Sequence, residues 1–80
     1  MSQKLIIYMP ALNEEKTILK VINAIPRKIV GFDVIEILVV NDASTDQTAI
    51  EAKKGGATVL NHNKNKGVGA AFQTAINYAL

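Results

Sequence analysis

Three polar segments, each following an apolar run, carry the residues that could do chemistry in this 80-residue chain. They are Pro-Ala-Leu-Asn-Glu-Glu at 10–15, Asn-Asp-Ala-Ser-Thr-Asp at 41–46 and Asn-His-Asn-Lys-Asn-Lys-Gly at 61–67. Ligands of open parallel sheets bind beyond the carboxyl ends of the strands. If the apolar runs are parallel strands, we expect all three segments to lie on one rim of the sheet.

The second segment holds the most informative side chain, Asp42. A carboxylate directly after a buried strand can accept hydrogen bonds from a base N–H or from ribose hydroxyls. It can equally tie down its own loop in an Asx-turn, and both interpretations stay open. Glu14, in an expected first helical turn, is more typical of a helix-dipole partner than of a ligand. Ser44 is predicted to be a helix cap.

The third segment offers weaker signals. Gly67-Val-Gly69 resembles the start of a dinucleotide fingerprint, but Phe72 stands at the third glycine position and the motif follows the third apolar run. Lys64 and Lys66 could meet phosphate, although such lysines are usually solvated. His62 has no carboxylate or cysteine partner nearby in sequence, so we predict a structural or solvent-facing role.

The apolar runs at 5–9, 35–40 and 57–60 are predicted strands. The run at 35–40 is nearly continuous, which is typical of a strand covered on both faces. After the first run, Asn13 is expected to cap a helix that Pro26 ends. Its apolar stripe is predicted to be Ile18, Val21, Ile22 and Ile25.

Two further helices follow the other runs. Ser44 and Gln47 fit a capping box for the second helix, and Gly55-Gly56 closes it. The third opens at Gly67, with an expected apolar face formed by Phe72, Ala75, Ile76, Ala79 and Leu80. The order β-α-β-α-β-α predicts an α/β fold with a parallel sheet and right-handed crossovers.

Composition sets outer bounds on function. The chain is 49% hydrophobic and 20% charged, has no cysteine and carries a dispersed net charge of +2. Disulfides and thiolate metal sites are therefore excluded, and nucleic acid is not an expected partner. One histidine without cysteine also argues against a nucleophile–histidine relay or a histidine-rich metal site. The N-terminal apolar run is too short for a signal peptide, so a cytoplasmic location is expected.

The rim segments together resemble the N-terminal half of family 2 inverting glycosyltransferases, which have the GT-A fold. The stretch 5–15 resembles that family's first strand and Pro-x-x-Asn-Glu loop. The stretch 37–46 resembles its second strand and Asp-x-Ser-x-Asp turn, and 65–71 resembles its Asn-Arg-Gly-x-Gly-x-Ala segment. Three motifs in order, over nearly the whole chain, indicate one truncated nucleotide-sugar-binding subdomain spanning residues 1–80.

The resemblance implies roles for particular residues. Pro10, Ala11 and Leu12 would line the base and ribose pocket, Glu14 would meet the ribose, and Asp42 the base. Ser44 would stabilise the loop that carries Asp42, and the helix opening at Gly67 would pack close to the donor. Two departures blur donor identity: Asn41 replaces a frequent second aspartate, and Lys66 replaces a frequent arginine.

The first and third motifs most resemble polyprenyl-phosphate mannosyl- and glucosyltransferases. That likeness implies transfer from GDP-mannose or UDP-glucose to a lipid-linked phosphate at the cytoplasmic membrane face. The family's Asp-x-Asp motif, which binds Mg²⁺ or Mn²⁺, would follow a fourth strand beyond Leu80. We therefore expect no catalytic residue, no metal ligand and no transferase activity in these 80 residues alone, and at most weak nucleotide binding.

Two other functions stay open. A dinucleotide-binding segment of an oxidoreductase predicts a glycine motif after the first strand, where Pro10-Ala-Leu-Asn13 stands instead. A non-catalytic α/β nucleotide-binding fragment fits the length equally well. In each case the unpaired edge of a parallel sheet favours self-association.

Overall fold

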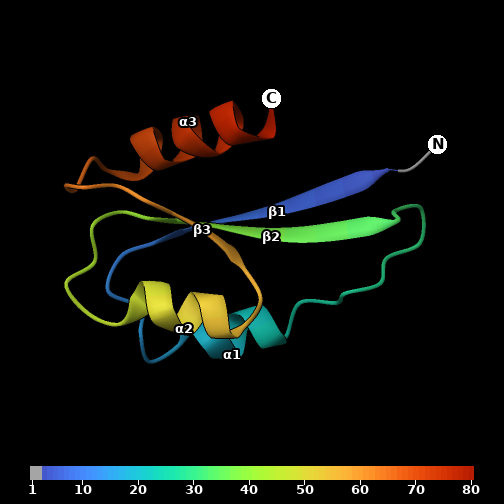
Figure 1. Cartoon of the computed structure of the whole chain (residues 1–80), viewed down its shortest axis with the longest axis horizontal. Coiled ribbons are helices and arrows are strands. Elements are labelled where there is room, and N and C mark those ends of the chain that lie inside the picture. The colour runs from blue at the N-terminus through green and yellow to red at the C-terminus, as the bar shows by residue number, and fades with distance from the viewer. Residues whose placement is uncertain (1–2) are drawn as a thin grey trace.

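Strands and helices alternate strictly along the chain (Figure 1). The structure is a computed structural model that describes residues 3–80. Its elements are β1 (Lys4–Ala11), α1 (Ile18–Asn23), β2 (Val34–Asn41), α2 (Thr48–Lys54), β3 (Thr58–Asn61) and α3 (Val68–Ala79). The predicted β-α-β-α-β-α order and the three strands are confirmed.

The sheet is parallel, with β2 in the centre and β1 and β3 on either side. Ala11 is level with Asn41, and Asn41 is level with Asn61, so the strands end together. The three polar segments consequently leave the sheet at the same rim, as predicted.

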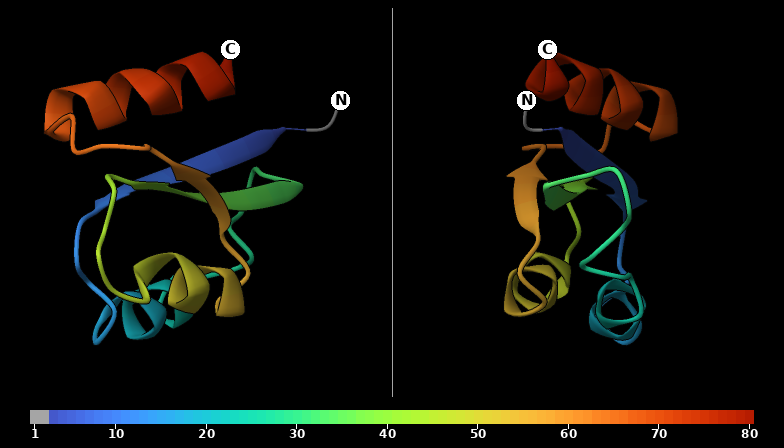
Figure 2. Two further views of the ribbon diagram at one scale, coloured as in Figure 1. Left: turned by 60° about the vertical axis from the view of Figure 1, so that its left-hand side comes forward. Right: turned by 90° about the vertical axis from the view of Figure 1, so that its right-hand side faces the viewer.

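The sheet has an apolar core on each face. Figure 2 shows α1 and α2 on one side and α3 on the other. Successive residues of β2 alternate between the two cores, and Ile37 to Val40 are all at most 1% exposed. The first core joins α1 and α2 to the sheet through Ala11, Ile18, Ile22, Ile37, Val39 and Ala52. The second core joins α3 to the sheet through Leu38, Val40, Ala71 and Ala75. The predicted double burial of the central strand is confirmed.

The chain changes faces between β3 and α3. Helix α3 packs mainly against β2 and β1, on the opposite side of the sheet from α1 and α2. This reversal places the first turn of α3 near the end of β1. Open α/β sheets bind ligands beyond the carboxyl ends of their strands, which is the end of the sheet that this turn approaches.

The start of the first helix differs from the prediction. Asn13 does not cap α1; it has a left-handed backbone with φ 54°. A turn at residues 15–17 intervenes, and α1 begins only at Ile18. Asn13 is instead used between loops, because its side-chain oxygen accepts a hydrogen bond from the Thr45 amide. Val21, predicted to face the core, is 46% exposed.

The predicted capping box of the second helix is also wrong. Helix α2 begins at Thr48, and the Asp46 carboxylate accepts hydrogen bonds from the Thr48 amide and hydroxyl. Ser44 is used elsewhere, as described below. The predicted end is confirmed, because Gly55 follows the last helical residue and Gly56 adopts φ 85°.

The buried face of α3 is narrower than predicted. Ala71 and Ala75 are buried, whereas Phe72 is 54% exposed and Ile76 is 37% exposed. Leu80, also assigned to the face, is almost fully exposed. The helix approaches the sheet with its small residues, because alanines four apart let its backbone lie close to the strands.

A polar cluster ties the amino half of the sheet to α3. The Glu36 carboxylate of β2 pairs with Lys4 of β1 at 2.8 Å. It also accepts hydrogen bonds from Thr58 of β3 at 2.7 Å and Tyr78 of α3 at 2.6 Å. These contacts lower the pKa of Glu36 to about 2, with the Lys4 contact as the largest cause. One side chain thus links all three strands to the end of α3.

Candidate functional site

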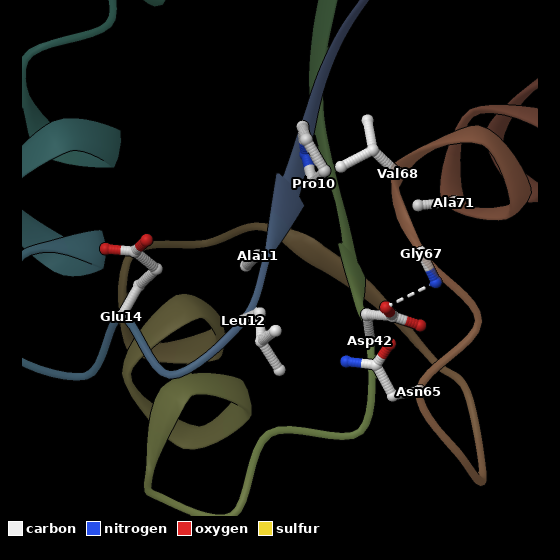
Figure 3. A pocket seen from close by; sticks show the side chains of 9 residues that line it. All are labelled: Pro10, Ala11, Leu12, Glu14, Asp42, Asn65, Gly67, Val68 and Ala71. Atoms are coloured by element: carbon white, nitrogen blue, oxygen red, sulfur yellow. Dashed lines mark hydrogen bonds between the residues drawn. The ribbon is translucent and has the colours of Figure 1, made fainter.

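A cavity of about 260 Å³ opens at the carboxyl ends of β1 and β2, beside the start of α3 (Figure 3). Its walls come from three separate parts of the chain, which the parallel register brings together. The lining residues are Pro10, Ala11, Leu12, Glu14, Asp42, Asn65, Gly67, Val68 and Ala71.

The β1 wall of the cavity is apolar. Ala11, the last residue of β1, is 4% exposed, whereas Leu12 is 43% exposed at the mouth. Because the Ala11 carbonyl accepts the Asp42 amide at 2.9 Å, the two loops leave the sheet side by side. An apolar wall beside a carboxylate suits a ligand with a flat apolar surface and polar edges.

Asp42 forms the polar wall and is 6% exposed. Its Oδ1 accepts hydrogen bonds from the Lys66 amide at 2.8 Å and contacts His62 Nδ1 at 2.7 Å. Its Oδ2 accepts the Gly67 amide at 2.9 Å, the bond drawn in Figure 3. The pKa of Asp42 is lowered, first by the His62 hydrogen bond and then by the Lys66 amide. Asp42 is therefore an ionised carboxylate at the cavity wall.

The loop that Asp42 holds is distant in sequence. The proposed Asx-turn would tie down the loop directly after Asp42, but the carboxylate holds the loop after β3 instead. The Asx-type contact of the β2–α2 loop belongs to Asp46. Local sequence left two interpretations of Asp42 open, a structural role and a binding role. In the structure Asp42 has a structural role and also lies on the cavity wall.

Gly67 has a geometric reason to be glycine. It adopts φ 92°, a region that residues with a side chain rarely enter, and it directly precedes α3. That conformation turns its amide toward Asp42 while the chain enters the helix. The glycine predicted to open the helix therefore also donates its amide to Asp42.

The side chain of His62 is only 6% exposed. One ring nitrogen contacts Asp42 and the other lies 2.8 Å from the Thr74 hydroxyl of α3. The solvent-facing alternative is wrong, because the histidine has a carboxylate partner twenty residues earlier in the chain. The pairing of Asn41 with Asn61 makes the next residues, Asp42 and His62, neighbours.

Glu14 lies on the wall opposite Asp42. It is exposed, and its carboxylate accepts a hydrogen bond from the Thr17 hydroxyl at 3.1 Å. In Figure 3 the Glu14 carboxylate points away from Asp42, although both residues line the cavity. The two carboxylates share one rim, and a ligand between them would contact Glu14 with its outer part.

Ser44 stands behind the cavity and does not line it. Its hydroxyl bonds to the Asn41 side-chain oxygen and accepts the Asn13 amide at 2.9 Å. Asn13 in turn accepts the Thr45 amide, also at 2.9 Å. These contacts clamp the β1–α1 loop to the β2–α2 loop and so hold both walls in register.

The two departures from the family pattern lie outside the cavity lining. Asn41 is 6% exposed and donates a side-chain hydrogen bond to Asn61 at 2.9 Å. Lys66 contributes its backbone amide to Asp42, and its side chain is not part of the wall. Lys64 is exposed and likewise outside the lining.

Sequence reasoning missed four residues of this region. Asn65, Val68 and Ala71 line the cavity, and the Thr74 hydroxyl lies within hydrogen-bond distance of His62, for which a structural role was one of the two predictions. Asn65 and Ala71 belong to a motif that sequence analysis did identify, so their position was available from it. Nothing in the sequence indicated a role for Thr74, because the partner of a threonine inside a helix depends on where the helix packs.

Within residues 3–80 no group of three or more His, Asp or Glu side chains could hold a metal ion. The described residues therefore do not by themselves fit a divalent metal site. Over the same stretch, no helix has the length and apolarity that crossing a membrane requires.

Solved structures share this architecture. Glucosyl-3-phosphoglycerate synthase of Mycobacterium tuberculosis superposes with a TM-score of 0.77 at 32% identity, covering 95% of this chain and 30% of that one. The same enzyme in complex with Mn²⁺, UDP and glucosyl-3-phosphoglycerate gives a TM-score of 0.75, covering 96% of this chain and 29% of that one. The three β–α units match the Rossmann-like N-terminal part of GT-A glycosyltransferases.

Sequence relatives agree. Protein MJ1222 of Methanocaldococcus jannaschii is 38% identical over 77 residues, which are 96% of this chain and 30% of the relative. The 4,4'-diaponeurosporenoate glycosyltransferase of Staphylococcus aureus is 48% identical over 56 residues, 70% of this chain and 14% of the relative. This chain thus spans less than a third of the relatives it matches. Residues 6–80 match the family described as Glycosyl transferase family 2, and the chain belongs to that family.

Proposed function

We propose that this chain is the donor-binding part of a glycosyltransferase that takes a hexose from a nucleotide-sugar. One observation carries the proposal: all the site residues implied by the family resemblance except Ser44 line a single cavity. They come from the end of β1 and the loop after it, from the residue that follows β2 and from the residue that precedes α3.

The cavity suits the nucleoside end of such a donor. Its apolar wall at Pro10, Ala11 and Leu12 can pack against a base, and Asp42 can accept a hydrogen bond from a base N–H or a ribose hydroxyl. Glu14, at the mouth, can meet the ribose. Its volume of about 260 Å³ is small for a whole nucleotide-sugar, so the sugar would extend beyond these residues.

Uridine is the donor base we test first. The mycobacterial enzyme has been crystallised with UDP-glucose, Mn²⁺ and phosphoglyceric acid, so a neighbour of this fold binds a UDP-sugar. GDP-mannose remains the other donor proposed from the sequence. The metal would be Mg²⁺ or Mn²⁺, and we propose that its ligands follow Leu80.

The proposed acceptor is a polyprenyl phosphate. It rests on the likeness of the Asn65–Ala71 and Pro10–Glu15 motifs to polyprenyl-phosphate glycosyltransferases. A phosphate acceptor is already ionised at neutral pH, so attack on the sugar needs no strong general base. Such an acceptor would place the whole protein at the cytoplasmic membrane face.

The experiment is a titration of the chain with UDP, GDP and NAD, followed by backbone amide shifts in NMR. We expect UDP or GDP to shift the amides of Ala11, Leu12 and Gly67, and we expect no sugar transfer. A preference for NAD would support the oxidoreductase alternative, and silence toward all three would support a non-catalytic module.

Asp42→Ala tests the polar wall. We expect it to abolish the UDP-induced shifts. Asp33→Ala is the matched control, because the Asp33 carboxylate also accepts a backbone amide, that of Gln3 at 3.0 Å, but at the opposite end of the sheet. Equal nucleotide binding by wild type and Asp42→Ala would show that Asp42 contributes only to structure.

A further inference from the structure

A continuous hydrogen-bonded line joins Asp42, on the cavity wall, to His62 and Thr74. The His62 and Asp42 side chains are 6% and 8% exposed, and Thr74 is half-buried. Asp42 Oδ1 is 2.7 Å from His62 Nδ1, and His62 Nε2 is 2.8 Å from the Thr74 hydroxyl. The three residues come from the end of β2, the end of β3 and the middle of α3. The line joins the ends of β2 and β3 to α3, which covers the face of the sheet opposite to α1 and α2.

The partners determine which ring nitrogen carries the proton. An ionised carboxylate can only accept hydrogen bonds, so Nδ1 must be protonated to bond Asp42. In the neutral ring Nε2 is then an acceptor, and the Thr74 hydroxyl donates to it. Thr74 therefore favours the one neutral tautomer that is useful to Asp42.

This arrangement leaves Asp42 with unequal oxygens. Among residues 3–80, Oδ1 accepts two bonds, from His62 and the Lys66 amide, whereas Oδ2 accepts one, from the Gly67 amide. A carboxylate offers about four acceptor sites, so the remaining one belongs to Oδ2. His62 itself is absent from the cavity lining, so any effect on a ligand must pass through Asp42.

We propose that His62 is a positioning residue for the donor nucleotide. By occupying Oδ1, and with Thr74 holding its ring, it keeps the Asp42 carboxylate turned so that Oδ2 is available at the cavity. Through Asp42 it also holds the backbone of Lys66 and Gly67, and Gly67 lines the cavity beside Asp42. This role rests on the proposed function, since UDP or GDP is the ligand that Oδ2 would serve.

The experiment compares substitutions that remove different parts of the line. His62→Phe removes both ring nitrogens, and we expect UDP to bind about tenfold more weakly, the loss typical of one hydrogen bond to a charged group. His62→Asn keeps a donor close to the position of Nδ1 and should restore affinity to within about threefold of wild type. Thr74→Val keeps the helix shape, removes the hydroxyl and should weaken binding by an intermediate factor.

A second readout reports on the loop without any ligand. Hydrogen exchange of the Lys66 and Gly67 amides should accelerate in His62→Phe and stay slow in His62→Asn. Tyr78→Phe is the control, because it removes a hydrogen bond from the same helix at the Glu36 end. We expect it to lower the melting temperature while UDP affinity and exchange at Lys66 and Gly67 stay unchanged.

The outcomes separate the two proposals. UDP binding by wild type with equal affinity in His62→Phe would overturn the positioning role and leave the proposed function intact. Equal losses of UDP affinity in His62→Asn and His62→Phe would also overturn the positioning role. They would show that a hydrogen bond donated to Asp42 at this position does not affect binding. Failure of wild type to bind UDP or GDP would overturn the proposed function, whereas loop exchange would still show whether His62 holds the wall.

Discussion

Two carboxylates near the ends of β2 have similar chemistry and different surroundings. Glu36, in the amino half of the strand, contacts Lys4, Thr58 and Tyr78. Asp42, just past the carboxyl end, contacts His62 and two backbone amides. Both have a lowered pKa, and both connect β2 to α3, Glu36 directly and Asp42 through His62.

The difference lies in what the partners belong to. The partners of Glu36 are side chains of regular strands and a helix, whose positions the sheet and the cores already determine. Two partners of Asp42 are amides of an irregular loop, which has no ladder to hold it. Asp42 also lines the cavity at the rim, which Glu36 does not. Glu36 thus holds elements together at one end of β2. Asp42 at the other end holds an irregular loop and forms part of the candidate binding site.

The largest expected effect comes from the same chemical change at both ends, Asp42→Asn and Glu36→Gln. In Asp42→Asn an amide NH₂ replaces one acceptor oxygen and faces a backbone N–H, so we expect UDP affinity to fall at least about tenfold. Glu36→Gln should lower the melting temperature while changing UDP affinity less than about twofold. Calorimetric titration with UDP measures both, and equal losses of affinity at the two ends would erase the distinction.

An effect of medium size, on the free energy of unfolding, is expected at Ala43. This residue follows Asp42 and has a left-handed conformation with φ 63°. Glycine enters this region without the steric cost that alanine has, so Ala43→Gly should stabilise the fold by about 0.5–1 kcal/mol. Urea unfolding checks the gain. Ala49→Gly, inside α2, is the matched control and should destabilise by about 1 kcal/mol. Destabilisation by Ala43→Gly would show that the rim loop is unstrained.

The smallest effect on UDP affinity is expected from the pH dependence of the Glu36 end, which acts on stability. The pKa of Glu36 lies at about 2 in the folded chain, below its ordinary value of 4.5. Stability from the ionised carboxylate is therefore fully present above about pH 4.5 and is lost as the pH falls toward about 2. The stability difference between wild type and Glu36→Gln should shrink over this window. A difference that stays constant from about pH 7 to about pH 2.5 in urea unfolding would contradict it.

Local pattern predicted most of the fold. The uninterrupted run at 35–40 was sufficient to predict a central strand buried on both faces, because only such a strand needs no polar side. The capping predictions failed at Asn13 and Ser44 for one shared reason. Both residues form their hydrogen bonds at the rim instead of within their own helices: Asn13 bonds Ser44 and Thr45, and the Ser44 hydroxyl also bonds Asn41.

The candidate site was likewise predicted in part from the sequence. Sequence placed Pro10, Ala11, Leu12, Glu14, Asp42 and Gly67 at strand ends and helix starts, and the structure gathers them around one cavity. It could not show that Val68 completes the wall, nor that Glu14 and Asp42 stand on opposite sides of the cavity. Those features depend on the face of the sheet to which α3 crosses.

The sequence by itself determined the order of the elements, the parallel sheet and the rim where polar residues collect, because each follows from periodicity and short-range chemistry. Only the tertiary structure decided the partners of Asp42 and His62. Their meeting requires two strands to align side by side and α3 to bring Thr74 to the second ring nitrogen. Contacts between residues twenty positions apart are invisible to local pattern, since burial and register create them only when the chain has folded.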